Sequence, residues 1–235
     1  MNHYWQPIER QWYEESRAHL AELEAIYIDA HEWLADFAED PEFTSRRPSA
    51  SVVIQRLLLR RLGEELRGVE LLALNGHGFQ AISATTNLLE HAHLLTYLSA
   101  SEERAEGYRT WESPAKQVAS VKDLIKKSGN ERGWTKERIE QEHEKYRFLC
   151  GFKHNNSIMQ RILLLPPPND PDLVMGKFAL AESVHLVLTA VSILMFSVLC
   201  RDSLNRKIGE VNVLLESAER QYPRLVGIAN RLSPL

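Results

Sequence analysis

Apolar residues recur at intervals of three and four along most of the chain, the period of an α-helix with one buried face. The first such stripe ends near Pro41 and contains Leu20, Leu23, Tyr27, Ala30, Leu34 and Phe37. A second stripe follows, with Ser49 or Ser51 available as its N-cap. A third helix is predicted from about Val69 to Ser99, with Gly76 and Gly78 inside it as candidates for a kink or a close helix crossing.

The second half of the chain carries further helix signals. "SPAK" at 113–116 predicts a capped helix that ends near "KKSGN", and Thr135 can cap the next helix. The proline-rich stretch 163–172 predicts a linker, which an apolar helix (178–200) and an amphipathic one (about 205–220) follow. Because no segment alternates with period two, we predict an all-α bundle of long antiparallel helices. We expect N-terminal helices at 1–68, a core at 69–222 and a tail at 223–235.

Composition narrows the class of protein. The chain has 235 residues, a formal net charge of −4 and a pI near 6.2, which argues against coating nucleic acid through net charge alone. Cys150 and Cys200 match no metal or redox spacing and are expected to be buried thiols in a reducing compartment. The N-terminal stretch lacks a secretory pattern, and the most apolar segment, 186–200, is short for a membrane span. We therefore expect a cytoplasmic protein without a membrane partner.

The stretch "EKYRFLCGFKHNNS" at 144–157 carries the main candidate chemistry. Arg147 and His154 are seven residues apart, about two helical turns, so both side chains leave the same helix face. A guanidinium that holds a phosphate and an imidazole that transfers a proton are the minimum needed to cleave RNA. The neighbouring side chains that can help to bind phosphate or base are Tyr146, Lys153, Asn155 and Asn156.

A structural interpretation of the same residues stays open. Lys153, His154 and Asn155 are also typical of a helix C-terminus, where cations favour the helix dipole and asparagine tolerates the left-handed cap. Arg147 can be a surface residue paired with Glu144.

Two Glu-x-x-His pairs, Glu90/His93 and Glu182/His185, resemble half of a carboxylate-bridged di-iron site in a helical bundle. Such a site also needs a lone glutamate from each of two other helices, and the candidates are Glu65, Glu70, Glu142 and Glu144. The alternative is a hydrogen-bonded polar layer inside the bundle that binds no metal.

The order of these segments resembles the HEPN-like helical proteins (higher eukaryotes and prokaryotes nucleotide-binding), and within them an uncharacterised, mostly bacterial family. "FQAISATTNLLEHAHLLTYL", a helix ending "YRFLCGFKHNN", a proline-rich linker and an apolar helix carry the resemblance, over roughly residues 69–201. It places the family's glutamate, tyrosine and histidine at Glu90, Tyr146 and His154. It also implies a homodimer that joins two histidines in one cleft, and a ribonuclease motif of Arg, four to six residues, then His.

The leading hypothesis is therefore a cytoplasmic HEPN-like homodimer that binds or cleaves RNA without metal or cofactor, in a toxin–antitoxin or defence setting. His154 is its general acid/base, Arg147 its phosphate clamp, and Glu90 or Asn87 the orienting residue. Phe148 stands where active members carry a polar residue, which keeps a non-catalytic interaction or dimerisation module open, with a protein partner. The di-iron bundle is the second alternative.

Overall fold

The computed structural model describes residues 7–39, 49–110, 120–153, 171–192, 206, 208–213 and 216. Within these ranges the regular structure is entirely helical, which confirms the all-α prediction. The helices are α1 (Pro7–Glu39), α3 (Ala50–Leu74), α4 (Gly78–Ser99), α5 (Glu102–Arg109), α7 (Val121–Glu131), α8 (Lys136–Lys153) and α10 (Pro171–Ser192).

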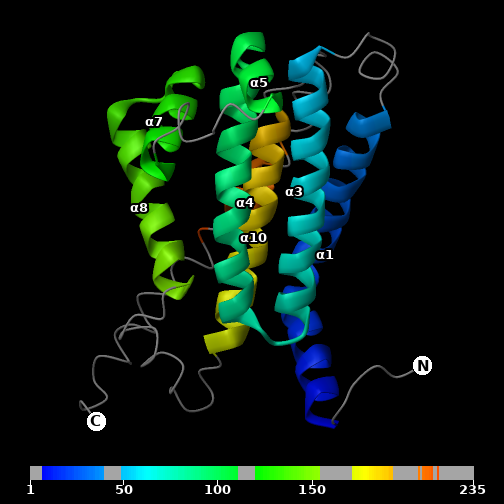
Figure 1. Ribbon diagram of the computed structural model, residues 1–235. Coiled ribbons are helices and arrows are strands. Elements are labelled where there is room, and N and C mark those ends of the chain that lie inside the picture. The colour runs from blue at the N-terminus through cyan, green and yellow to red at the C-terminus, as the bar shows by residue number, and fades with distance from the viewer. Residues whose placement is uncertain are drawn as a thin grey trace.

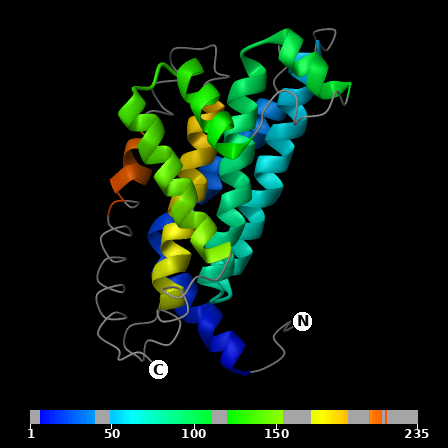
Figure 2. The same ribbon diagram turned by 60° about the vertical axis from the view of Figure 1, so that its left-hand side comes forward.

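The long helices form a bundle (Figure 1). α4 packs on α3 and α10, and α10 also contacts α3 and α1, so these four helices enclose the main core. α7 and α8 form a helical hairpin that covers one side of α4, and the short α5 packs against α3 and α4. Turned by 60°, the hairpin stands in front of α10 and α4 (Figure 2). Helices from both ends of the chain thus contribute to one core.

The predicted caps lie at the helix starts. The Ser49 hydroxyl accepts from the backbone N–H of Val52 (3.3 Å), and the Thr135 hydroxyl accepts from the N–H of Arg138 (3.3 Å). α3 has a second cap from far along the chain, because the Glu102 carboxylate accepts from the N–H of Ala50 at 2.6 Å. A side chain of α5 therefore fixes the start of α3.

The predicted single helix from Val69 to Ser99 is wrong, because α3 ends at Leu74 and α4 begins at Gly78. Gly76 adopts φ 76°, a left-handed conformation that ends the helix and that most side chains avoid. Gly78 marks the expected close crossing, since a Cβ there would lie 2.0 Å from the backbone oxygen of Asp172 in α10. α3 also runs without interruption through position 68.

Other expectations differ in smaller ways. α10 begins at Pro171, seven residues before the predicted start at 178, and a proline is well tolerated at a first helical position. α5 was not predicted, although Ser101 caps it. Cys150 is half-buried rather than buried. The "SPAK" start, the linker up to residue 170, Cys200 and most of the segment 205–220 lie outside the described residues.

The core is aliphatic. Each of its fully buried large side chains contributes about 1.5–3 kcal/mol through removal of apolar surface from water. These side chains are Leu59, Leu62, Leu66, Ile82, Leu88, Leu89, Leu95, Leu98, Ile125 and Leu149. Among the described helices, none combines the length and the apolar character that crossing a membrane requires.

Candidate functional site

α8 carries most of the predicted site residues, and it presents Arg147 to solvent. The Arg147 guanidinium donates to the Glu144 carboxylate at 2.8 Å, and the two side chains are 64% and 56% exposed. This is the surface pair that the structural interpretation predicts, and such exposed pairs contribute at most about 1 kcal/mol to stability. The guanidinium is therefore open to a ligand. His154 and Asn155 lie outside the described residues, so the Arg147–His154 geometry stays a prediction.

Tyr146 and Glu90 are brought together across two helices. The Tyr146 hydroxyl donates to the Glu90 carboxylate at 3.1 Å, which joins α8 to α4. Burial, together with the neighbouring Cys150 thiol and the Glu90 carboxylate, raises the pKa of Tyr146 above its ordinary value. The phenol therefore stays protonated at neutral pH and keeps the hydrogen bond.

The remaining predicted residues flank this contact. Asn87 is exposed on α4, three residues before Glu90, and Lys153 is exposed at the last position of α8. Sequence spacing puts Asn87 and Glu90 on one stripe of α4. The described part of the predicted site is thus one interhelical hydrogen bond, Glu90–Tyr146, with Arg147 next to it.

A second polar group lies inside the bundle, beneath the α7–α8 hairpin. The His93 ring of α4 meets the Ser128 hydroxyl at 2.6 Å through Nδ1 and the Glu142 carboxylate at 3.4 Å through Nε2. Burial lowers the pKa of His93, and the Glu142 carboxylate only partly offsets this effect. His93 is therefore a neutral imidazole at neutral pH, held between α7 and α8.

Lys145 extends this group to α10. Its ammonium lies 3.5 Å from Glu142 Oε2 and 3.0 Å from Glu182 Oε1. Burial disfavours the charged lysine, but the two carboxylates outweigh that penalty and raise the pKa of Lys145. Burial likewise acts against the Glu142 carboxylate, but the neighbouring His93 ring and the nearby cations outweigh it and lower the pKa of Glu142 to about 2. Lys145 and Glu142 are therefore charged in the folded protein.

Ser128, His93 and Glu142 have the residue types of a nucleophile, a base and an orienting acid. Ser128 and His93 are, however, 0% and 1% exposed. The Ser128 hydroxyl also donates to the carbonyl oxygen of Ile125 at 3.1 Å. Because no substrate can reach a hydroxyl that is closed off in this way, the arrangement is a structural link between α4, α7 and α8.

The two Glu-x-x-His pairs are not assembled into a metal site among the described residues. Glu90 faces Tyr146, whereas His93 faces Glu142. The Lys145 ammonium lies between the carboxylates of Glu142 and Glu182, in the place where a metal ion would have to bridge them. The four candidate lone acids have partners of their own: Glu65 meets Arg61 and His91, Glu70 meets Arg67, Glu142 meets Lys145 and Glu144 meets Arg147.

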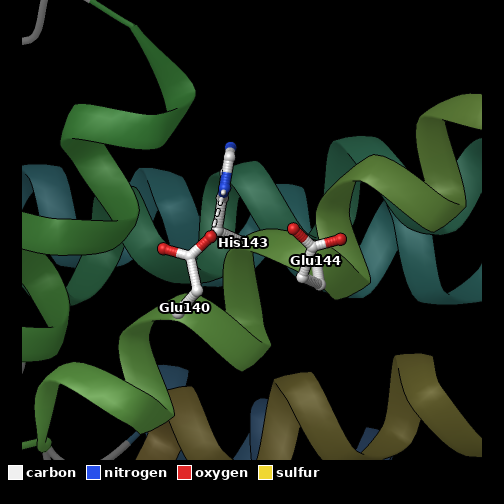
Figure 3. A group of neighbouring side chains, drawn as sticks. All are labelled: Glu140, His143 and Glu144. Carbon is white, nitrogen blue, oxygen red and sulfur yellow. Dashed lines mark ion pairs between the residues drawn. The ribbon is translucent and has the colours of Figure 1, made fainter.

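Only one set of three potential ligand atoms in the described part of the chain lies within 4.8 Å, and it consists of Glu140, His143 and Glu144 (Figure 3). All three residues come from the outer side of α8. His143 Nδ1 is 3.6 Å from Glu140 Oε1, and Glu144 is already paired with Arg147. Exposed carboxylates of this kind are typical of a solvated helix face, so we assign no metal to them.

Comparison of the chain with protein-family models, with curated proteins and with solved structures gives no match. Functional inference therefore depends on the residues themselves. Sequence reasoning had singled out Glu90, Tyr146 and His93, but it missed Ser128 and Lys145. The available signal for Lys145 was its position on the stripe of α8 that also holds the buried residues Leu149 and Phe152.

Proposed function

We propose that the chain is an HEPN-like RNA-binding ribonuclease, whose site lies around the C-terminal half of α8 and is completed by a second protomer. Arg147 holds the scissile phosphate, and His154 transfers protons. The observation that carries the proposal is the Glu90–Tyr146 hydrogen bond of 3.1 Å, because it joins two of the three residues that the resemblance selects. The exposed guanidinium of Arg147 supports it, since it is held only by a surface pair.

The proposed chemistry needs no metal and no co-reactant. The ribose 2′-oxygen attacks the adjacent phosphorus, and the bond from phosphorus to the 5′-oxygen breaks. One imidazole takes the 2′-hydroxyl proton and another returns a proton to the leaving 5′-oxygen, which explains why two protomers would be required. Arg147 stabilises the charge that develops on the phosphorane oxygens. Glu90 acts through Tyr146, as a positioning residue.

The test is cleavage of a fluorescent single-stranded RNA in the presence of EDTA. We expect His154→Ala to lower the rate by about 10²- to 10⁴-fold and Arg147→Ala by about 10²- to 10³-fold. Arg60→Ala is the matched control, because Arg60 is also an exposed arginine paired with a nearby glutamate, Glu64, at 3.0 Å. It should leave the rate unchanged. Full activity in His154→Ala would reject the assignment.

A non-catalytic interaction module is the second candidate, and the surroundings of Phe148 favour it. Phe148 packs edge-on against Phe152 and Phe178, with ring centroids 5.1 and 5.5 Å apart, so it joins α8 to α10. This candidate gives the "YRFLCGFKHNN" segment a packing role. It predicts no cleavage by the parent protein at any concentration, and a reduced Tm in His154→Ala. Light scattering measures the dimer in both cases.

A further inference from the structure

Positive charge is concentrated in the α7–α8 hairpin, away from the Arg147 region. Residues 120–138 contain six Lys or Arg against three Asp or Glu, although the whole chain has a net charge of −4. The remaining residues are therefore distinctly acidic. Residues 120–138, which comprise α7, the following turn and the first residues of α8, form a basic segment that we call the basic island. An anionic partner would be attracted to this island.

Three lysines of this island are exposed and have no ion-pair partner among the described residues: Lys122, Lys126 and Lys136. We call them the hairpin lysines. Exposed arginines on other helices have a nearby glutamate partner, as in Arg10–Glu14 and Arg60–Glu64. The hairpin lysines keep their full charge for a partner, whereas most surface cations do not.

Two of the hairpin lysines occupy positions that are unfavourable for the helix itself. Lys122 lies in the first turn of α7 and Lys136 is the first residue of α8. The positive end of the helix dipole favours acids there, and a cation costs roughly 0.3–1 kcal/mol. Such local violations of a stability rule are concentrated at functional positions.

The hairpin that carries these lysines is rigidly attached to the bundle. Arg132 donates to the Thr96 hydroxyl of α4 at 2.6 Å, and its guanidinium lies 5.0 Å from the centre of the Trp134 ring. The ring of Trp134 also meets His93 edge-on, at 6.0 Å. A Cβ on Gly129 would lie 2.8 Å from the side chain of Ile139, so α7 and α8 approach closely. Ligand binding here costs little ordering of the backbone.

The charges are spread out rather than convergent. Lys122 and Lys126 are one turn apart, about 6 Å along α7, and Lys136 begins the next helix. A single small anion cannot contact all three, whereas a phosphate backbone can be neutralised at separate points. We propose that the hairpin lysines form an anchoring surface for the phosphate backbone of single-stranded RNA. The choice of RNA as the polyanion rests on the proposed function.

This surface is separate from the proposed cleavage site. Lys136 and Arg147 lie on the same face of α8, about 16 Å apart along the axis. Glu140 and Glu144 occupy that face between them, and their carboxylates repel phosphate. The RNA is therefore held at two separate points. Loss of one point should leave the other intact.

The test is fluorescence anisotropy of a labelled, unstructured 20-nucleotide RNA, titrated with the full chain at several salt concentrations. The triple variant Lys122→Gln/Lys126→Gln/Lys136→Gln should make the negative slope of the log association constant against log salt shallower by roughly 2. Each lost contact to single-stranded RNA removes about 0.7 from the magnitude of the slope. The control variant Arg10→Gln/Arg60→Gln/Arg61→Gln removes three exposed cations that already have glutamate partners. It should leave the slope unchanged.

The outcomes separate this inference from the proposed function. Binding that depends on the hairpin lysines, with no cleavage by the parent, supports the anchoring surface and rejects the ribonuclease. An unchanged slope in the triple variant overturns the anchoring surface, even if His154→Ala abolishes cleavage. Heparin can be used as a competitor, with its concentration matched so that each sulfate replaces one nucleotide phosphate. If heparin displaces the labelled RNA as well as unlabelled RNA does, the assignment to RNA is overturned and the surface binds polyanions in general. No binding of RNA by the parent also overturns it.

Discussion

Removal of the buried ammonium of Lys145 should destabilise this protein more than removal of any exposed cation. In Lys145→Met the side chain keeps its approximate volume and loses its charge. Glu182, which is 0% exposed, then loses the cation at 3.0 Å from its carboxylate. Glu142 loses one at 3.5 Å but keeps His93. The variant therefore leaves one buried carboxylate uncompensated.

The expected loss is about 3–5 kcal/mol, the cost of breaking a buried ion pair by removing one partner. Because a domain of this size is stable by about 5–15 kcal/mol in total, the loss would be easily measured. Adding Glu182→Gln to Lys145→Met removes the uncompensated charge. We expect the double variant to recover a large part of the stability, since an apolar or neutral pair avoids the desolvation penalty.

Urea unfolding followed by circular dichroism measures this effect as a shift in midpoint with an unchanged m-value. Lys126→Met is the matched control, because Lys126 is exposed on α7, and it should change stability by at most about 0.5 kcal/mol. A loss below about 1 kcal/mol in Lys145→Met would refute the reasoning.

Three further predictions use other contacts. The pKa of Glu142 is lowered from 4.5 to about 2 in the folded state, so its contribution to the free energy of unfolding is present above pH 5 and is lost as pH falls toward 2. The free energy of unfolding, measured as a function of pH, should fall by about 3 kcal/mol over this range. The variant Glu142→Gln should abolish this pH-dependent loss. Gly78→Ala should lower Tm sharply, because its Cβ would meet the α10 backbone, whereas Gly68→Ala, with nothing within 4 Å, should raise Tm slightly. Tyr146→Phe should cost about 1.5–3 kcal/mol in urea unfolding through the unpaired Glu90, and an unchanged midpoint would argue against that hydrogen bond.

Helix starts were predictable from the sequence because they depend on local chemistry. A serine or threonine before an apolar stripe satisfies the first N–H groups, as Ser49 and Thr135 do. The joint between α3 and α4 was not predictable to the residue, because Gly76 and Gly78 both fit a kinked helix. What decides between a kink and a turn is the approach of α10 to Gly78, a contact between residues more than 90 positions apart.

The exposed ion pair of the candidate site was predictable from the sequence. Arg147–Glu144 follows from the i, i+3 spacing. Tyr146 and Glu90 were linked only through the family resemblance, since helix periodicity within one segment cannot say which helix it will face. Lys145 was missed because it lies within a charged stretch, where a lysine gives no signal of its own. Its spacing from Leu149 puts it on the buried stripe of α8, where an ionisable residue needs a partner.

The charge on Lys145 also decides what a repeated Glu-x-x-His pattern means in this bundle. Glu142 and Glu182 are neutralised by the Lys145 ammonium and by Arg138, which lies 3.8 Å from Glu142, while His93 stays neutral. A divalent ion placed in this layer would add two buried charges beside a cation that is already present, and no further carboxylate among the described residues compensates them. His93 and Glu182, one residue from each Glu-x-x-His pair, therefore belong to a charge-compensated polar layer in which Lys145 lies between the carboxylates of Glu142 and Glu182.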